Sequence, residues 1–419
     1  MTGDIIDSIR PLIEDHFESE FKDTFVPGET TIRLSRPTFG PDEVLESLAS
    51  LLSTQVTMGE KVARFESEWA DYIGSEHAHL VNSGSSANLL ALKFLGENVI
   101  DPGDEVIVPA VAWSTSLFPV LDIGAIPVLV DIDPDTYTLD VDAFRKAITD
   151  KTAAVVLVHL LGHPCDMDSI LEICKANDVY IIEDCCEAHG AEYDGQEVGT
   201  FGDVATFSFF FSHHITTIEG GMVVTDDTHL SERIRMGRAH GWIRELDDKS
   251  DLLERYPGID SRFLFASEGY NLRPTEIQGA FGIHQLPKLD SFVERRRKNA
   301  KKLTNLLNRY DALDLFEPDP KVDCSWFAYP IQVSETAGFT RDELQKHLED
   351  HKIETRPILA GNLARQPVLE HVDHRLNGQL EGAQRIHETG FFIGNHHRLT
   401  DEKINYIVST VDDFIKSSD

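Results

Sequence analysis

The sequence predicts an α/β fold in which a mostly parallel sheet carries helices on both faces. Short, nearly continuous apolar runs rich in Val, Ile and Leu recur between residues 105 and 225, and stretches with helical apolar spacing separate several of them. Strands that are apolar on both sides belong in sheets covered on both faces, and helical crossovers make neighbouring strands parallel. The predicted strands are 105–109, 127–131, 153–159, 179–183, 204–209 and 222–225.

The chain is long enough for two domains and a terminal arm. Single cores seldom grow beyond about 250–300 residues, and this chain has 419. We expect an N-terminal arm over residues 1–35, a large domain over 36–310 and a smaller α+β domain over 311–419. Within the large domain, charged and irregular residues predict an exposed insertion near 240–265.

Turn and cap residues mark the predicted helices. Pro41 and the apolar residues that follow it at helical spacing predict a helix entering the large domain. A second amphipathic helix ends at Gly74. In the C-terminal part, Thr340 and Glu343 have the spacing of a capping box, and apolar residues within 404–414 predict a last amphipathic helix.

Composition and charge exclude several classes of function. A formal net charge of −34 leaves no cationic footprint for a nucleic-acid backbone. The chain has no run of about eighteen apolar residues and no signal peptide, so we expect no membrane association and a cytoplasmic location. The five cysteines form no regular framework and no Cys/His set has zinc spacing, so we expect reduced thiols and no metal site.

Polar and aromatic residues that follow predicted strands are candidates for a ligand site, because such sites lie beyond the carboxyl ends of strands in open α/β sheets. Asp184 and Glu187 follow strand 179–183, where an aspartate can hold a pyridinium nitrogen protonated. Trp113 follows strand 105–109, where its indole either packs against the core or offers a flat face for stacking a cofactor ring.

A helix rich in alanine and leucine opens at Gly84 and Ser85. Free backbone N–H groups at such a helix start can receive a phosphate. Capping alone explains a Gly-Ser helix start equally well. Its place just upstream of the alternating strands favours the phosphate.

Residues 207–221 predict the end of a buried strand, a polar turn and a glycine-closed loop. The strand carries Ser208 and delivers His213 to the edge of the sheet, where imidazole can exchange protons near neutral pH. Taken alone, His213 and His214 are more simply explained as surface or capping histidines.

This segment resembles the signature of the sugar aminotransferases of the DegT/DnrJ/EryC1/StrS family, in which a serine, a catalytic lysine and Glu-Gly-Gly follow one another at this spacing. The lysine would fall at His213, and the chain has no lysine between Lys175 and Lys249. A small branch of the family carries histidine at this place and removes the C3 hydroxyl of nucleotide-linked 4-keto-6-deoxyhexoses. The His-His-Ile-Thr run at 213–216 matches that branch.

The resemblance runs from about Arg36 to about Phe414 and implies a fold-type I, aspartate aminotransferase-like architecture. It also implies noncovalently bound pyridoxamine or pyridoxal 5′-phosphate, because imidazole cannot form the Schiff base that lysine forms. The implied cofactor contacts are Gly84, Ser85, Ser208 and Asn271 for the phosphate, Trp113 and Asp184 for the ring, and Glu187 as a weaker candidate. Asn271 would reach the phosphate of the neighbouring subunit in a homodimer with shared active sites. The implied substrate contacts are Arg356 and Arg365, and the implied catalytic residue is His213.

The implied reaction is C3 dehydration of a nucleotide sugar, with L-glutamate regenerating the pyridoxamine form. The related CDP-sugar enzyme with an iron–sulfur centre has clustered cysteines where this chain has none, although Cys186 falls at one ligand position. We therefore expect no iron–sulfur cluster, which favours GDP-4-keto-6-deoxymannose over a CDP sugar. Two alternatives stay open: a nucleotide-sugar aminotransferase with an unusual base, and a non-enzymatic vitamin B6-binding protein.

Overall fold

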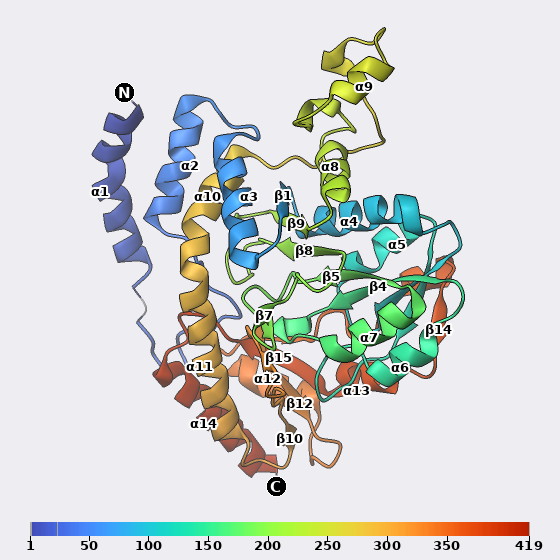
Figure 1. Ribbon diagram of the computed structural model, residues 1–419. Helices are drawn as coiled ribbons and strands as arrows, with labels where there is room; N and C mark the ends of the chain where they lie inside the picture. Colours follow the sequence, from blue (N-terminus) through green and yellow to red (C-terminus); the bar gives the residue numbers. More distant parts are fainter. Residues whose placement is uncertain (1, 23, 419) are drawn as a thin grey trace.

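An eight-stranded sheet forms the centre of the molecule (Figure 1) and has the order β1-β9-β8-β5-β4-β2-β3-β14. The computed structural model describes residues 2–22 and 24–418, so residues 1 and 23 of the predicted arm and residue 419 of the predicted C-terminal domain lie outside the described residues. The strands are β1 (His77–Val81), β2 (Glu105–Pro109), β3 (Ile126–Val130), β4 (Thr152–Val158), β5 (Tyr180–Asp184), β8 (Val204–Ser208), β9 (Gly221–Thr225) and β14 (Arg375–Asn377). From β8 to β14 all neighbours are parallel, whereas β9 runs antiparallel to both β8 and β1. The prediction of a mostly parallel sheet is therefore confirmed.

Helices cover both faces of this sheet, which explains why its strands are apolar on both sides. Figure 1 shows α4 and α5 on one face and α6 and α7 on the other. Successive residues of β2 alternate between these layers: Val106 and Val108 belong to the core that contains α4, and Ile107 belongs to the core that contains α6 and α7. The covering helices are α4 (Gly84–Val99), α5 (Phe118–Asp122), α6 (Val141–Ala147), α7 (Met167–Asn177) and α8 (Thr228–Gly237).

A second group of helices packs against the β1–β9–β8 side of the sheet. Phe65 and Trp69 of α3 are fully buried and contact Phe209 at ring-centre distances of 5.2 and 4.9 Å. The helices of this group are α1 (Thr2–Glu20), α2 (Pro41–Ser53), α3 (Glu60–Ile73), α10 (Glu276–Gln285) and α11 (Leu289–Leu307). The segment that leads to His213 is thus anchored by an aromatic core directly beneath it.

The C-terminal part forms a four-stranded antiparallel sheet with its own helices. Its elements are β10 (Leu313–Asp314), β12 (Ala328–Val333), α12 (Arg341–Asp350), β13 (Thr355–Pro357), α13 (Glu381–Thr389), β15 (Gly390–Gly394) and α14 (Asp401–Ser418). The capping box of Thr340 and Glu343 opens α12 as the sequence indicates. The domain boundary near residue 311 stays a prediction, and β14 from beyond it pairs with β3 in the large sheet.

Short elements complete the fold. A small three-stranded sheet contains β6 (Glu192–Tyr193), β7 (Gln196–Glu197) and β11 (Val322–Asp323). The 3₁₀ helices are η1 (Ser114–Ser116), η2 (Leu160–Gly162), η3 (Ile243–Glu245), η4 (Ser261–Phe263), η5 (Leu286–Lys288), η6 (Leu363–Arg365) and η7 (Pro367–His371). Helix α9 (Ser250–Arg255) projects away from the sheet in Figure 1, together with the segment predicted as an insertion.

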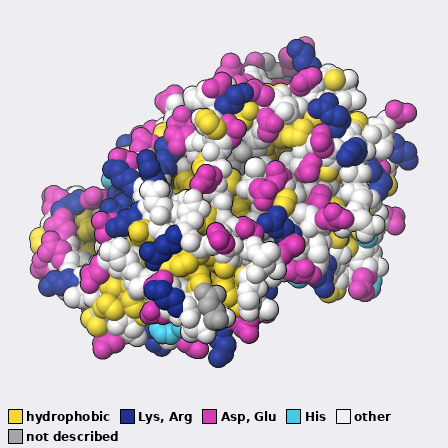
Figure 2. Space-filling model, turned by 90° about the horizontal axis from the view of Figure 1, so that it is seen from below, with side chains coloured by type: hydrophobic (Ala, Val, Ile, Leu, Met, Phe, Trp, Pro, Cys, Tyr) yellow, Lys and Arg dark blue, Asp and Glu magenta, His cyan; other side chains and the backbone are white. Residues whose placement is uncertain are grey.

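Negative charge is spread over the face of the molecule that Figure 2 shows. Figure 2 shows Asp and Glu side chains distributed over the whole of one face, with Lys and Arg side chains among them. A diffuse charge of this kind favours hydration of the surface. Among the described helices, none combines the length and the apolar character that a membrane crossing needs.

The packing of α10 on α3 yields a stability prediction. A Cβ atom at Gly279 would lie 2.4 Å from the backbone nitrogen of Val62. We therefore expect Gly279→Ala to lower the free energy of unfolding by roughly 1–3 kcal/mol, measured by chemical denaturation. The matched control is Gly96→Ala, also inside a helix, where the added Cβ would meet side chains at 3.4 Å or more. This control should be neutral or stabilising, and equal stability of the two variants would contradict the prediction.

Candidate active site

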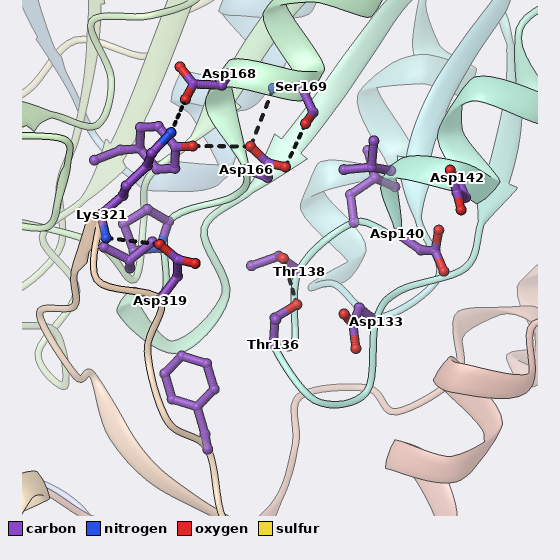
Figure 3. A pocket seen from close by; sticks show the side chains of 16 residues that line it. Asp133, Thr136, Thr138, Asp140, Asp142, Asp166, Asp168, Ser169, Asp319 and Lys321 are labelled. Carbon is purple, nitrogen blue, oxygen red and sulfur yellow. Dashed lines mark hydrogen bonds and ion pairs between the residues drawn. The ribbon is translucent and has the colours of Figure 1, made fainter.

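A cavity of about 670 Å³ lies beside the N-terminal ends of α6 and α7 (Figure 3) and is strongly acidic. Its carboxylates have structural partners: Asp140 accepts a hydrogen bond from the Ala143 amide, and Asp168 pairs with Lys321 at 2.5 Å. Asp166 caps α7 and accepts a hydrogen bond from Tyr193, as Figure 3 shows. A lining of this charge repels phosphate groups, so this cavity does not suit a phosphorylated ligand.

A second cavity, of about 420 Å³, lies at the carboxyl ends of β2, β5 and β8. Seven residues predicted for the site line it: Gly84, Ser85, Trp113, Asp184, Glu187, Ser208 and His213. Its other lining residues are Ser83, Thr115, Ser116, Val158, Cys186, Phe210, Ser212, Glu219, Phe327, Leu359 and Phe392. The size is that of a cofactor or small-molecule site, and the place is where open α/β sheets bind ligands.

Gly84, Ser85 and Ser208 form one end of this cavity. Ser83 caps α4 by accepting a hydrogen bond from the Ser86 amide at 3.1 Å, so the amides of Gly84 and Ser85 lie in the first turn. First-turn amides have no partner within the helix and favour an anion. A Cβ atom at Gly84 would lie 2.6 Å from Cβ of Ser208, so the glycine lets the Ser208 side chain approach the helix start. The arrangement fits a phosphate group.

Asp184 ends β5 at the base of the cavity and is 5% exposed. Its Oδ2 accepts hydrogen bonds from Asn88 Nδ2 at 2.9 Å and from Ser116 Oγ at 2.7 Å. Thr206 in turn donates a hydrogen bond of 2.5 Å to Asn88. These donors are neutral, so the carboxylate can still pair with a cation such as a protonated ring nitrogen.

Trp113 stands at the mouth of the cavity, immediately before η1. This residue is 57% exposed, which is unusual for a side chain of this size. An open indole face beside Asp184 suits a flat ring. Packing in the core, the alternative for Trp113, does not account for this exposure.

His213 follows β8 in a tight turn, in which its amide donates a hydrogen bond to the Phe210 carbonyl at 3.0 Å. The imidazole is half-buried beside Phe327, with Nδ1 buried and without a hydrogen-bond partner. Burial, together with the positive charge of Arg296, lowers the pKa of His213 to about 3. The ring is therefore neutral at neutral pH, so it can accept a proton within the cavity.

Glu187 is the second group in the cavity with a shifted pKa. Its Oε2 accepts a hydrogen bond from the Leu161 amide at 2.9 Å. Burial raises the pKa of Glu187 to about 7, and the negative charge of Asp184 acts in the same direction. Near neutral pH this carboxyl can donate a hydrogen bond as well as accept one.

The described cavity fits a pyridoxamine or pyridoxal phosphate without a covalent link to the chain. The anion-binding helix start, the carboxylate and the open indole correspond to the phosphate, the ring nitrogen and the ring face. None of the lining residues is a lysine. The site therefore supplies noncovalent contacts only.

Three predicted site residues do not line the cavity formed by the described chain: Asn271, Arg356 and Arg365. Asn271 is exposed and accepts a hydrogen bond from Arg273 at 3.1 Å. Arg356 on β13 and Arg365 on η6 are also exposed. Their roles as partner-subunit and substrate contacts stay predictions.

The sequence reasoning missed the residues that support Asp184 and those that close the cavity. Asn88 and Ser116 belong to the same motifs as Ser85 and Trp113, so their polarity next to those residues was an available signal. Phe327 and Phe392 come from strands of the C-terminal sheet or their flanks, and nothing in their local sequence distinguishes them from core residues.

One buried group of side chains has the composition of a metal site. His159, Glu183 and Cys185 place ligand atoms within 4.8 Å of one another. Glu183 bonds to His159 Nε2 at 3.0 Å and to three backbone amides, and His159 Nδ1 accepts from the Cys165 amide. Since these hydrogen bonds account for the polar atoms of His159 and Glu183, we assign no metal here.

Comparison with known proteins adds independent information. The sequence profile of the DegT/DnrJ/EryC1/StrS aminotransferase family matches residues 38–412. A GDP-4-keto-6-deoxy-D-mannose 3-dehydratase from Yersinia pseudotuberculosis is 43% identical over 358 residues, covering 84% of this chain and 91% of that protein. A dTDP-4-dehydro-2,6-dideoxy-D-glucose 3-dehydratase from Saccharopolyspora spinosa is 37% identical over 434 residues, covering 100% of this chain and 94% of that protein.

Two solved structures of GDP-4-keto-6-deoxymannose-3-dehydratase are also similar to this chain. A mutant with bound GDP-perosamine has a TM-score of 0.85 and 37% identity, covering 91% of this chain and 100% of that chain. A structure with a trapped PLP-glutamate geminal diamine has a TM-score of 0.85 and 37% identity, covering 90% of this chain and 99% of that chain. These sequence identities are well above those of protein pairs that share only a fold.

The shifted pKa of Glu187 yields a pH-dependent stability prediction. The pKa of this carboxyl is about 4.5 in the unfolded chain and about 7 in the folded protein. The protonated carboxyl therefore makes its full contribution to the free energy of unfolding below pH 4.5, and this contribution is lost as the pH rises from 4.5 to 7. We expect Glu187→Gln to stabilise the cofactor-free protein relative to wild type by roughly 1–3 kcal/mol at pH 8, and by less than half of that at pH 5. Thermal and chemical denaturation at both pH values would measure this.

The control is Glu172→Gln at an exposed position on α7. It should show the same small difference from wild type at pH 5 and pH 8. Equal effects of Glu187→Gln at the two pH values would show that folding does not raise the pKa of this carboxyl.

Proposed function

Because this chain belongs to the DegT/DnrJ/EryC1/StrS aminotransferase family, we propose that it is a pyridoxamine phosphate-dependent nucleotide-sugar 3-dehydratase. It removes the C3 hydroxyl of a nucleotide-linked 4-keto-6-deoxyhexose. The observation that carries this function is His213, a neutral imidazole in a cavity whose lining contains no lysine. Relatives named as 3-dehydratases support the same reaction.

The chain's own residues hold the cofactor. First-turn amides of α4 and the hydroxyl of Ser208 bind its phosphate, and Asp184 holds a proton on the ring nitrogen. Trp113 covers the ring face. When bound, the cofactor would supply a primary amine that is reactive toward carbonyl groups and a ring that accepts electrons.

His213 moves the proton in the cavity. Nδ1 is buried, which leaves Nε2 as the nitrogen available to the cavity, and the depressed pKa keeps the ring neutral, so that its nitrogen without a proton can act as a base. Once protonated, the same imidazolium is the acid available to the departing C3 hydroxyl. Lysine at this position would form a competing Schiff base, whereas imidazole cannot.

GDP-4-keto-6-deoxymannose is the substrate that we propose. Its support is the Yersinia pseudotuberculosis relative and the solved structure with bound GDP-perosamine. None of the lining residues of the described cavity is Lys or Arg, so the diphosphate must find its cations outside that lining. Arg356 and Arg365 are the exposed cations that we assign to it, and the PLP-glutamate structure supports L-glutamate as the amino donor.

We also propose a homodimer with shared active sites. Phe210, Phe211 and Ile218, on the segment that carries His213, are 45%, 39% and 48% exposed. Neighbouring apolar side chains with this exposure favour cover by another subunit. Asn271 of one subunit then contacts the phosphate in the other. The described chain has free cysteines and no disulfide, in keeping with the reducing cytoplasm that we propose as its location.

The function is tested by incubating the protein, pyridoxamine phosphate and L-glutamate with GDP-, CDP- and dTDP-linked 4-keto-6-deoxyhexoses. We expect mass spectrometry to show loss of one oxygen atom from the GDP sugar, with ammonia and 2-oxoglutarate formed in equal amounts. An amine at C4 with the C3 oxygen retained would make the protein an aminotransferase. Binding of the cofactor without turnover of any sugar would support the vitamin B6-binding alternative.

In the same assay, His213→Asn should lower kcat by roughly 10²–10⁴-fold, because it removes the group that transfers the proton. The control is His229→Asn at an exposed position on α8, which should retain wild-type turnover. Cofactor binding by the His213→Asn variant, followed by absorbance, should be retained. Full turnover by this variant would remove His213 from the mechanism.

Mixed dimers test the shared site. His213→Asn and Asn271→Ala subunits should each form dimers of low activity, because every site lacks one of its two groups. In a mixed dimer one site regains both groups, so the specific activity should rise to roughly half of the wild-type value per dimer. No recovery in mixed dimers isolated with two different affinity tags would show that Asn271 does not act across the interface.

A further inference from the structure

A cluster of buried polar atoms lies on the inner side of His213, and its members other than His213 take no direct part in the mechanism above. It comprises His189, His213, His214, Arg296, Ser325 and Asn395, and we call it the inner polar cluster. The buried atoms without a hydrogen-bond partner are both ring nitrogens of His189, Nδ1 of His213 and His214, Nε of Arg296, Oγ of Ser325 and Oδ1 of Asn395. Each buried polar atom without a partner lowers the free energy of unfolding by about 1–3 kcal/mol. A group of such atoms in one place therefore indicates a functional role.

His189 is the least expected member of this cluster. It is fully buried, and its ring contacts Trp69, Phe207 and Phe209 at centre-to-centre distances of 5.7, 5.7 and 5.5 Å. An apolar ring would satisfy these three neighbours without leaving nitrogens unpaired. Neither nitrogen makes a hydrogen bond of normal geometry, although the Ser208 main chain beside the ring stabilises a proton on it.

His189 also contacts the catalytic ring. The described ring contacts of His213 are with His189 at 5.9 Å, Phe327 at 5.3 Å and Phe210 at 6.4 Å. Of these three rings only His189 carries nitrogen. A centre-to-centre separation of 5.9 Å suits a hydrogen bond between two imidazoles after a small adjustment, or one bridging water.

The remaining members of the cluster leave His189 as the partner for His213. His214 already uses Nε2 to donate to the Ser325 carbonyl at 3.1 Å. Arg296 donates to the carbonyls of Trp326, Phe327 and Asn395, and among the described residues no carboxylate pairs with it. Burial, together with the charge of Arg296, keeps the neighbouring imidazoles neutral, so each ring carries a single N–H.

We propose that His189 is a positioning residue for His213, resting on the function proposed above: it accepts a hydrogen bond from Nδ1–H of His213, directly or through one water. The other nitrogen of His189 then faces the Ser208 carbonyl as a donor. This arrangement fixes the tautomer of His213 so that Nε2 carries the lone pair toward the cavity. The hydrogen bond of one imidazole nitrogen decides which nitrogen is free to act as a base.

The tautomer can be measured without cofactor or sugar, by NMR of protein labelled with ¹⁵N-histidine. The His213 signals are those missing from His213→Asn. We expect wild-type His213 to be protonated at Nδ1 and unprotonated at Nε2. In His189→Phe, which suits the aromatic surroundings, we expect a shift toward the Nε2–H tautomer or an average of both. His189→Gln, whose amide can both donate and accept, should restore the wild-type pattern.

The matched control is His163→Phe. His163 is also buried with both nitrogens unpartnered, but it stacks on Phe316 at 3.8 Å and does not line the candidate active site. This variant should leave the His213 signals unchanged. The proposal is overturned if wild-type His213 is unprotonated at Nδ1, or if His189→Phe gives the wild-type pattern. His189→Leu serves as the apolar variant if His189→Phe does not fold.

Kinetics provide a second readout. For His189→Phe we expect kcat to fall roughly 10–100-fold with KM changed less than about 3-fold, and partial recovery in His189→Gln. A rise in KM with unchanged kcat would mean that His189 only supports the fold. If the tautomer shifts as expected but no sugar is turned over by wild type, the proposed function fails while the assignment of His189 stands.

Discussion

The candidate site depends on the close approach of three backbone segments at its phosphate end. A Cβ atom at Gly221 would lie 2.3 Å from the Ser83 carbonyl oxygen, so β9 and the start of α4 meet only because residue 221 is glycine. Gly84 makes the corresponding approach to Ser208. These contacts place the first-turn amides, the Ser208 hydroxyl and the turn that carries His213 in one small region. Asp184 reaches the same region because β5 is parallel to β8 and ends beside it.

The buried charge next to the site is positive, whereas the net charge of the whole protein is negative. The chain has a formal net charge of −34, yet the charge buried behind His213 is that of Arg296, which is 3% exposed. Among the described residues, its guanidinium donates to carbonyl groups and pairs with no carboxylate. Burial lowers the pKa of Arg296 to about 9, so it remains a cation at neutral pH. Burial of the imidazole and, to a smaller extent, this cation lower the pKa of His213, although the guanidinium does not line the cavity.

The sequence allowed most of the central sheet and much of the site lining to be predicted, for identifiable reasons. Continuous apolar runs such as 153–158 have few alternatives to a buried strand, and the motifs around Gly84, Asp184 and His213 lie directly at strand or helix ends. Phe327 and Phe392 could not be found in this way, because their place in the site depends on how the C-terminal sheet packs against the large one. The roles of Asn271, Arg356 and Arg365 concern groups outside the described cavity.

Strand β14 could not be predicted from the sequence either, because Arg375-Leu376-Asn377 contains no apolar run. This segment forms a strand by pairing with the free edge of β3. Arg375 adds two hydrogen bonds of 2.7 Å to the Glu105 carboxylate, at the start of β2. The C-terminal part of the chain, which supplies the outer wall of the cavity, is thus held against the central sheet at the far edge of that sheet. A hinge between the two parts would have to break this strand pairing and ion pair. The strand pairing and the ion pair therefore hold the outer wall of the cavity in place against the central sheet.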